Sequence, residues 1–191
     1  EAQAGNALAM FDLGRISSVG IGQAPDEPQA QAWYAKALAA FRAVEKEQSN
    51  RYAEYRNGRM YAAGLGVERD YRMALRLYEQ AAVKGFPYAA WELGKVYRDG
   101  VGTRPDDRQA ARYFASAFRG FQVMEARSHD DKLQYRLGWM LLHEGIAERN
   151  KSAARKWFER SAAQGNENAR YQLAKLILGS DGSTPEEISQ A

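Results

Sequence analysis

The sequence predicts an all-α fold built from repeated pairs of helices. Three observations support this prediction: a glycine that recurs along the chain, aromatic and aliphatic residues at fixed distances from it, and a Gly-x-Gly motif that follows most copies. The composition agrees, because 45% hydrophobic and 27% charged residues among 191 are typical of a globular protein and argue against global disorder.

The recurrent glycine divides the chain into repeats of two alternating lengths. Successive copies lie 44, 36, 44 and 36 residues apart. They are Gly14, Gly58, Gly94, Gly138 and, with alanine in its place, Ala174. When residues 11–90 are aligned without a gap to residues 91–170, 23 positions are identical. An internal duplication therefore underlies the chain, and repeats of this kind stack on one another.

The first helix of each repeat surrounds this glycine. Three residues before the glycine stands an aromatic side chain, namely Phe11, Tyr55, Trp91, Tyr135 or Tyr171. Mostly aliphatic residues stand one position before and two positions after it, and together these positions cover a wide face of an α-helix. A glycine in such a face lowers helix propensity by about 1 kcal/mol. Its recurrence predicts a second helix that packs where a Cβ atom would not fit.

A glycine turn and a second helix follow. The turns contain Gly20 and Gly22, Gly64 and Gly66, and Gly100 and Gly102, with a degenerate copy at Gly145. Polar residues suited to cap the second helix come next, at Asp26, Asp70, Asp106 and Asn150. In the 36-residue repeats Gly85 or Gly165 ends this helix. In the 44-residue repeats it is expected to run on by about two turns, through residues 41–45 and 121–125.

The repeats form one expected solenoid domain over residues 1–191. Their approximate bounds are 6–50, 51–86, 87–129 and 130–166, with a partial repeat at 167–191. Residues 183–188 have the pattern of a further helix start, with a proline in the first turn. The chain has no initiator Met, and it ends at Ala191, shortly after this helix start. Both features predict a piece of a longer polypeptide. No signal peptide or membrane-spanning run is visible, which favours a cytoplasmic location and no membrane partner.

The pattern resembles the Sel1-like repeat, and its best copy covers residues 55–67 and continues with Asp70 and Ala74. This resemblance implies a right-handed α-solenoid of helix-turn-helix repeats, related to tetratricopeptide repeats, that scaffolds protein–protein interactions. The alternating repeat lengths and residues 130–135 are also similar to repeat tails of bacterial plasmid-mobilisation proteins. One departure is Asn57, which replaces an apolar residue and predicts a buried polar contact or a side chain that faces a groove.

No catalytic, cofactor-binding or metal-binding site is predicted. The absence of cysteine excludes disulfides, thiol nucleophiles and cysteine-ligated metals. His129 and His143 each precede a carboxylate, but neighbours on a helix point about 100° apart, so neither pair is a ready dyad or metal clip. The glycine turns lack the Gly-Lys-Ser/Thr of a phosphate loop. We therefore expect a protein that is not an enzyme; a cryptic hydrolase would need a metal or a unique polar pocket.

The first helices are expected to bind a partner through the face that is not core. The candidate partner-binding residues are Arg56, Arg59, Lys95, Arg98, Arg136 and Trp139. A basic strip around an aromatic residue suits an acidic peptide or a C-terminal carboxylate. Alternatively, these cations form solvated helix faces and pair with Glu54, Glu92 and Asp99. The sequence leaves open whether Trp139 is core or exposed.

Two function classes follow from this surface. The first is a scaffold or adaptor that binds a partner protein or peptide on its concave face. The second is a nucleic-acid-associated tail of a mobilisation protein, for which an isoelectric point near 9.1 is the supporting feature. The net charge is only +3 and acidic residues lie on the same helices, which disfavours nucleic acid. The identity of the partner and the oligomeric state stay open.

Overall fold

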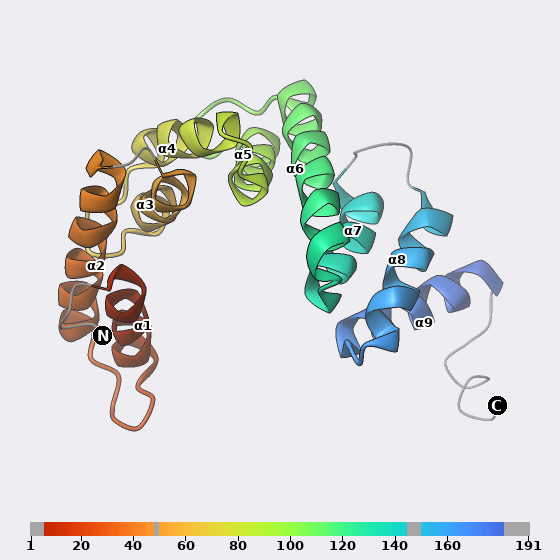
Figure 1. The fold of residues 1–191 in the computed structure, drawn as a ribbon, viewed down its shortest axis with the longest axis horizontal. Coiled ribbons are helices and arrows are strands. Elements are labelled where there is room, and N and C mark those ends of the chain that lie inside the picture. Colours follow the sequence, from red (N-terminus) through yellow and green to blue (C-terminus); the bar gives the residue numbers. More distant parts are fainter. Residues whose placement is uncertain (1–5, 48–49, 145–149, 182–191) are drawn as a thin grey trace. The chain divides into compact units, whose positions relative to one another are not determined.

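The computed structural model describes residues 6–47, 50–144 and 150–181, and all its regular elements there are α-helices, which confirms the all-α class (Figure 1). They are α1 (Ala7–Val19), α2 (Glu27–Glu47), α3 (Arg51–Ala63), α4 (Tyr71–Val83), α5 (Pro87–Asp99), α6 (Asp107–Ser128), α7 (Asp131–His143), α8 (Lys151–Ala163) and α9 (Glu167–Asp181). None of these helices is both long and apolar enough to span a bilayer. The helix start expected at residues 183–188 and the turn at Gly145 lie outside the described residues.

The chain divides at Ala110 into two compact units. Unit 1 holds α1 to α5 and the first turn of α6, and unit 2 holds the rest of α6 with α7 to α9. Odd-numbered helices are the first helices of the repeats and even-numbered helices the second ones. Within the units α1 packs on α2, α3 on α4 and α7 on α8, as the repeat predicts.

The predicted turns and caps are present. Carboxylate or amide oxygens of Asp26, Asp70, Asp106 and Asn150 each accept the backbone N–H three residues later, at 2.9–3.0 Å. Two further asparagines, Asn6 and Asn50, cap α1 and α3. Gly64 and Gly66 have φ angles of 70° and 69°, a left-handed conformation that glycine adopts without steric cost.

The recurrent glycine allows the two helices of a repeat to approach closely. A Cβ atom on Gly58 would lie 2.7 Å from Tyr78 Cε1, and one on Gly138 would lie 2.7 Å from Phe158 Cε1. This confirms the prediction that the second helix packs where a Cβ atom would not fit. Ala174 occupies the same position on α9, which is the last helix among the described residues, and there the side chain is exposed.

Helices α2 and α6 have 21 and 22 residues, against 13 for α4 and α8, which confirms the extension of the second helix in the 44-residue repeats. Each extension begins with a buried phenylalanine, Phe41 on α2 and Phe121 on α6. The extensions therefore contribute to the core of their units and are not only solvated overhangs.

Candidate functional site

In unit 1, side chains join the first helices of successive repeats into one face. The Tyr55 ring on α3 lies 5.1 Å from that of Phe86, the residue before α5, and 6.0 Å from that of Tyr88 on α5. On the other side, the guanidinium of Arg56 lies 4.1 Å from the centroid of the Phe11 ring on α1. Aromatic and basic residues therefore run from α1 through α3 to α5. We call this the α1/α3/α5 face.

Arg56 is half-buried and stacks on aromatic rings. Besides Phe11, its guanidinium lies 5.5 Å from the ring of Phe41 on α2 and 6.0 Å from the ring of Tyr52. Burial lowers the pKa of Arg56, and its Nε is buried with no hydrogen-bond partner within the described ranges. Arginine tolerates this because its planar, weakly hydrated guanidinium stacks on rings. Arg56 therefore connects α1, α2 and α3 through packing.

The other basic candidates of unit 1 lie nearer to solvent. Arg59 is exposed, and its charge opposes the rise in the pKa of Tyr55 that burial causes. Lys95 Nζ lies 2.5 Å from Glu92 Oε2 and 5.0 Å from the centroid of the Trp91 ring.

Arg98 is exposed as well, and it donates from Nε to Asp99 Oδ1 at 2.7 Å. This hydrogen bond lowers the pKa of Asp99. The alternative interpretation is that the basic candidates pair with neighbouring carboxylates. Lys95 and Arg98 do so, with Glu92 and Asp99. Glu54 differs, because it pairs with Lys84, the residue that follows α4.

Unit 2 holds the last two candidates on α7. The guanidinium of Arg136 is half-buried and lies 5.2 Å from the ring of Phe121, which repeats the stacking of Arg56 on Phe41 80 residues earlier. Trp139 is half-buried, packs against the buried Ala154–Phe158–Ala169 cluster and lies 4.7 Å from the ring of His143. Trp139 is therefore partly core and partly accessible.

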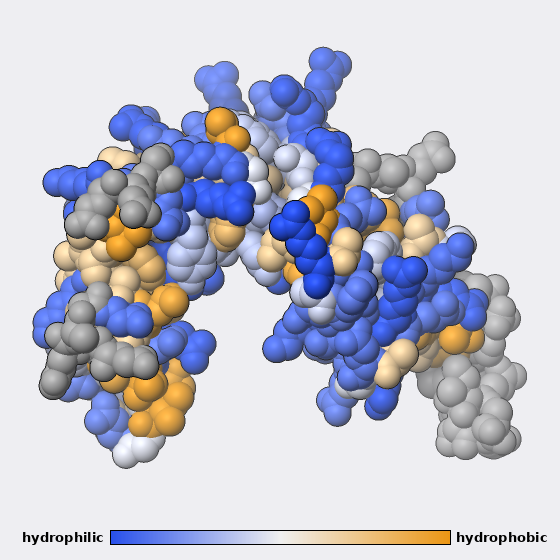
Figure 2. Space-filling model, in the orientation of Figure 1, coloured by the Kyte–Doolittle hydropathy of each residue, from blue (hydrophilic) through white to orange (hydrophobic). Residues whose placement is uncertain are grey.

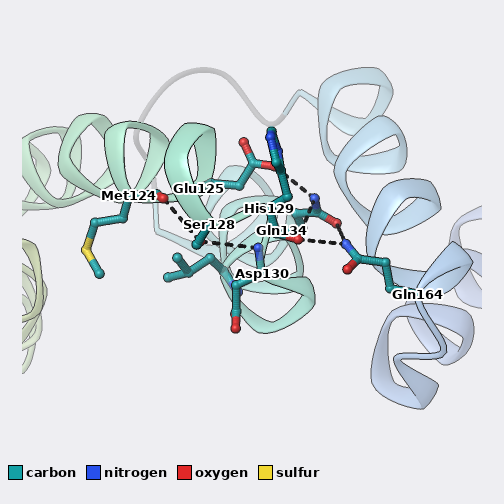
Figure 3. A network of polar contacts seen from close by, with 8 residues as sticks. Met124, Glu125, Ser128, His129, Asp130, Gln134 and Gln164 are labelled. Carbon is teal, nitrogen blue, oxygen red and sulfur yellow. Dashed lines mark hydrogen bonds and ion pairs between the residues drawn. The ribbon is translucent and has the colours of Figure 1, made fainter.

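Polar side chains in unit 2 tie the ends of α6, α7 and α8 together (Figure 3). Gln134 Nε2 donates to buried Glu125 at 2.8 Å, and Gln164 Nε2 donates to Gln134 Oε1 at 2.8 Å and to the backbone oxygen of His129 at 2.9 Å. The His129 ring is exposed, with Nδ1 3.8 Å from Glu125. Asp130 caps α7 by accepting from the Leu133 N–H. These contacts are structural, and within the described residues no three metal-ligating side chains come together.

Asn57 is the polar residue that the sequence singled out in the core of α3. It is 1% exposed, and its Nδ2 donates to Glu45 Oε2 on α2 at 2.6 Å. It also lines a groove between α2, α3 and α4. Both expectations for Asn57, a buried polar contact and a position at a groove, are confirmed.

The repeats match a known family along most of the described chain. The family model described as "Sel1 repeat" matches residues 7–40, 51–86, 87–120 and 132–166. A comparison with curated proteins gives no match. Among solved structures, a Sel1 repeat protein from Oxalobacter formigenes is 22% identical with a TM-score of 0.55, over 95% of this chain and 68% of that one. The present chain and the Oxalobacter formigenes protein have the same fold.

Two further solved structures are similar at lower TM-scores. One is c5321, a protective antigen present in uropathogenic Escherichia coli strains that displays an SLR fold; it is 24% identical with a TM-score of 0.46, over 95% of this chain and 50% of that one. The other is a Sel1 repeat protein from Klebsiella pneumoniae, 24% identical with a TM-score of 0.45, over 92% of this chain and 80% of that one.

Proposed function

Because the chain belongs to the Sel1 repeat family, we propose that it is a non-enzymatic scaffold whose first helices bind a partner protein or peptide. Sel1 repeat proteins generally act as scaffolds for protein–protein interactions. The observation that carries the proposal is the α1/α3/α5 face. There the cations of Arg56 and Lys95 pack against aromatic rings of the first helices.

The residue types on this face are those that dominate protein interfaces. Tyr52 is exposed, Tyr88 and Trp91 are half-buried, and Lys95 lies 5.0 Å from the centroid of the Trp91 ring. Arg59 is exposed on α3. Tyrosine, tryptophan and arginine are enriched among the residues that contribute most to binding energy. Apolar surface is available in unit 1 as well, because hydrophobic side chains gather over α1 (Figure 2).

The charges of the face favour an acidic partner. A surface ion pair such as Lys95 with Glu92 contributes only about 0–1 kcal/mol, so a partner's carboxylate can replace Glu92 at small cost. Arg59 offers a second cation for a bidentate contact. We include Arg98 on α5 and, in unit 2, Arg136 and Trp139 on α7 as further contacts. We also include Arg56, whose half-buried guanidinium stacks on the Phe11 ring.

The experiment is a comparative capture from the lysate of the source organism. The wild-type chain, an Arg59→Glu/Lys95→Glu variant and an Arg72→Glu/Arg76→Glu control are immobilised, and bound proteins are quantified by mass spectrometry. The control changes the same charge on exposed positions of α4. We expect a partner that the wild type and the control capture and the Arg59/Lys95 variant loses, with unchanged helicity. Identical capture by all three proteins would contradict the proposal.

The nucleic-acid role receives no support. Neither the family match nor the solved structures support the resemblance to mobilisation-protein tails. Several cations near the expected strip already have carboxylate partners, as Lys95 and Arg98 do. No observation on this molecule favours phosphate over a peptide carboxylate, so the protein scaffold is the function proposed.

A further inference from the structure

We propose that the partner is held in unit 1 by a leucine anchor, which inserts into a pocket between α3, α4 and α5. The pocket has a volume of about 210 Å³. A cavity of about 150 Å³ can hold benzene, so this pocket has room for one apolar side chain. Its apolar lining residues are Ala62, Tyr71, Ala74, Tyr78, Val96 and Val101. Lys95 of the α1/α3/α5 face also lines the pocket, so the inference rests on the proposed function for the partner and names the side chain that the partner inserts.

The second copy of the repeat shows which side chain suits this place. Eighty residues after Ala62, the equivalent position on α7 is Leu142. Leu142 packs against the buried cluster that contains Phe158. Phe158 is the counterpart of Tyr78, which lines the pocket in unit 1. In unit 2 a leucine of the chain itself therefore packs on the counterpart of a pocket wall.

Two smaller residues leave this space open in unit 1. Ala62 has a methyl group where Leu142 has the larger isobutyl group. Val96 replaces Leu176, which also packs against the buried cluster of unit 2. Protein interiors are close-packed, so a leucine brought by a partner would restore in unit 1 the packing that unit 2 makes internally.

The turn after α5 fixes the rim of the pocket. A Cβ atom on Gly102 would lie 2.5 Å from Tyr71 Cβ, so this turn lies directly against the start of α4. Val101, the residue before Gly102, and Tyr71 both line the pocket, and both are exposed. Apolar surface is therefore accessible to a partner's side chain at this rim.

The charged residues of the pocket favour a neutral side chain. The carboxylates that line it are those of Glu92 and Asp99. Glu92 pairs with Lys95, and Asp99 accepts from Arg98 Nε at 2.7 Å. Both carboxylates thus already have a cation, and a partner's lysine or arginine would be desolvated there without a free counter-charge. A leucine has no polar group that needs a partner, and it gains free energy by leaving water.

Random peptides displayed on phage and selected on the full chain provide the probe. Selected peptides are labelled with fluorescein, and their dissociation constants are measured by fluorescence polarisation. We expect the peptides to share a leucine, whose replacement by alanine weakens binding about tenfold or more. Ala62→Leu, which places the side chain of the second copy in the pocket, should weaken binding by at least as much. Ala63→Leu makes the same change at the next, exposed position and should bind normally.

A second variant keeps the test independent of packing around Ala62. Tyr71→Lys installs the residue of the second copy, Lys151, at an exposed position of the rim, and it should also weaken binding. Thermal denaturation checks the fold, and Ala62→Leu should be at least as stable as wild type because it fills a space. Equal binding of every selected peptide to wild type and Ala62→Leu would overturn the proposal. So would peptides that share a lysine or arginine in place of the leucine, or no enriched peptide.

Capture from the lysate separates this inference from the proposed function. A partner that Arg59→Glu/Lys95→Glu loses and Ala62→Leu retains would support the α1/α3/α5 face and overturn the leucine anchor. Leucine peptides that Ala62→Leu no longer binds, together with identical lysate capture by all variants, would support the pocket and contradict the proposed function.

Discussion

The guanidinium of Arg56 lies 4.1 Å from the centroid of the Phe11 ring, and this contact joins the first helices of two successive repeats. The same guanidinium reaches Phe41 on the helix between them. In unit 2, Arg136 stacks on Phe121 at the equivalent position. The sequence suggests that Arg56 is a surface residue, but its side chain packs between two repeats.

Replacing Arg56 with alanine should lower the free energy of unfolding by about 1–3 kcal/mol. The change removes a partly desolvated cation–π contact and the packing of the side chain on Phe11 and Phe41. Arg59→Ala, at an exposed position one turn away, should change it by less than about 0.5 kcal/mol. Urea denaturation measures both. Equal effects would show that the stacking of Arg56 contributes nothing to stability.

Adding a methyl group at the recurrent glycine should destabilise the fold. In Gly58→Ala the new Cβ would meet the buried Tyr78 ring at 2.7 Å, and such overpacking costs about 1–3 kcal/mol. This cost equals or exceeds the gain in helix propensity when alanine replaces glycine, which is about 1 kcal/mol.

The exposed position of the fifth copy provides the matched control. Ala174→Gly should itself be destabilising, by about 1 kcal/mol, because Ala174 is exposed and glycine has the lower helix propensity. Thermal denaturation of both variants tests this contrast. A more stable Gly58→Ala protein would contradict the close approach of α3 and α4.

The sequence predicts this fold well because its signals are local and repeated. The recurrent glycines at the helix–helix contacts, the turn glycines and the capping residues each act within one helix pair. Each of these signals occurs several times. The longer second helices follow from spacing alone. The roles of Arg56 and Asn57 are harder to predict, because they depend on which side chains of other helices lie opposite. A column of basic residues does not reveal that Arg56 stacks while Arg59 stays exposed.

The Glu54–Lys84 ion pair of unit 1 should be replaceable by the amides of unit 2. The equivalent residues 80 positions later are Gln134 and Gln164, which hydrogen-bond at 2.8 Å. Lys84→Ala leaves the buried Glu54 carboxylate without this partner and should cost about 1–3 kcal/mol of stability. A Glu54→Gln/Lys84→Gln protein should recover most of that loss. A double-mutant cycle in urea measures the coupling, and additive losses would contradict it.

The chain should lose stability in alkali through its buried tyrosines. Burial raises the pKa of Tyr78 above its ordinary value of 10.0, and the pKa of Tyr55 in the same direction. Above about pH 10 the unfolded chain releases these protons while the folded chain retains them, so the free energy of unfolding falls. Below that pH this contribution is complete and constant. Urea titrations between about pH 8 and pH 11 should show a shallower fall for Tyr78→Phe. An unchanged slope would exclude Tyr78 as a source.

The dissociation constant of the captured partner tests the scaffold most directly. Isothermal titration calorimetry should compare the wild type with Arg59→Glu/Lys95→Glu and with the Arg72→Glu/Arg76→Glu control. A partner held on the α1/α3/α5 face should bind the first variant at least tenfold more weakly, a loss of about 1.4 kcal/mol or more, and the control normally. The same dissociation constant for all three proteins would show that this face does not bind the partner.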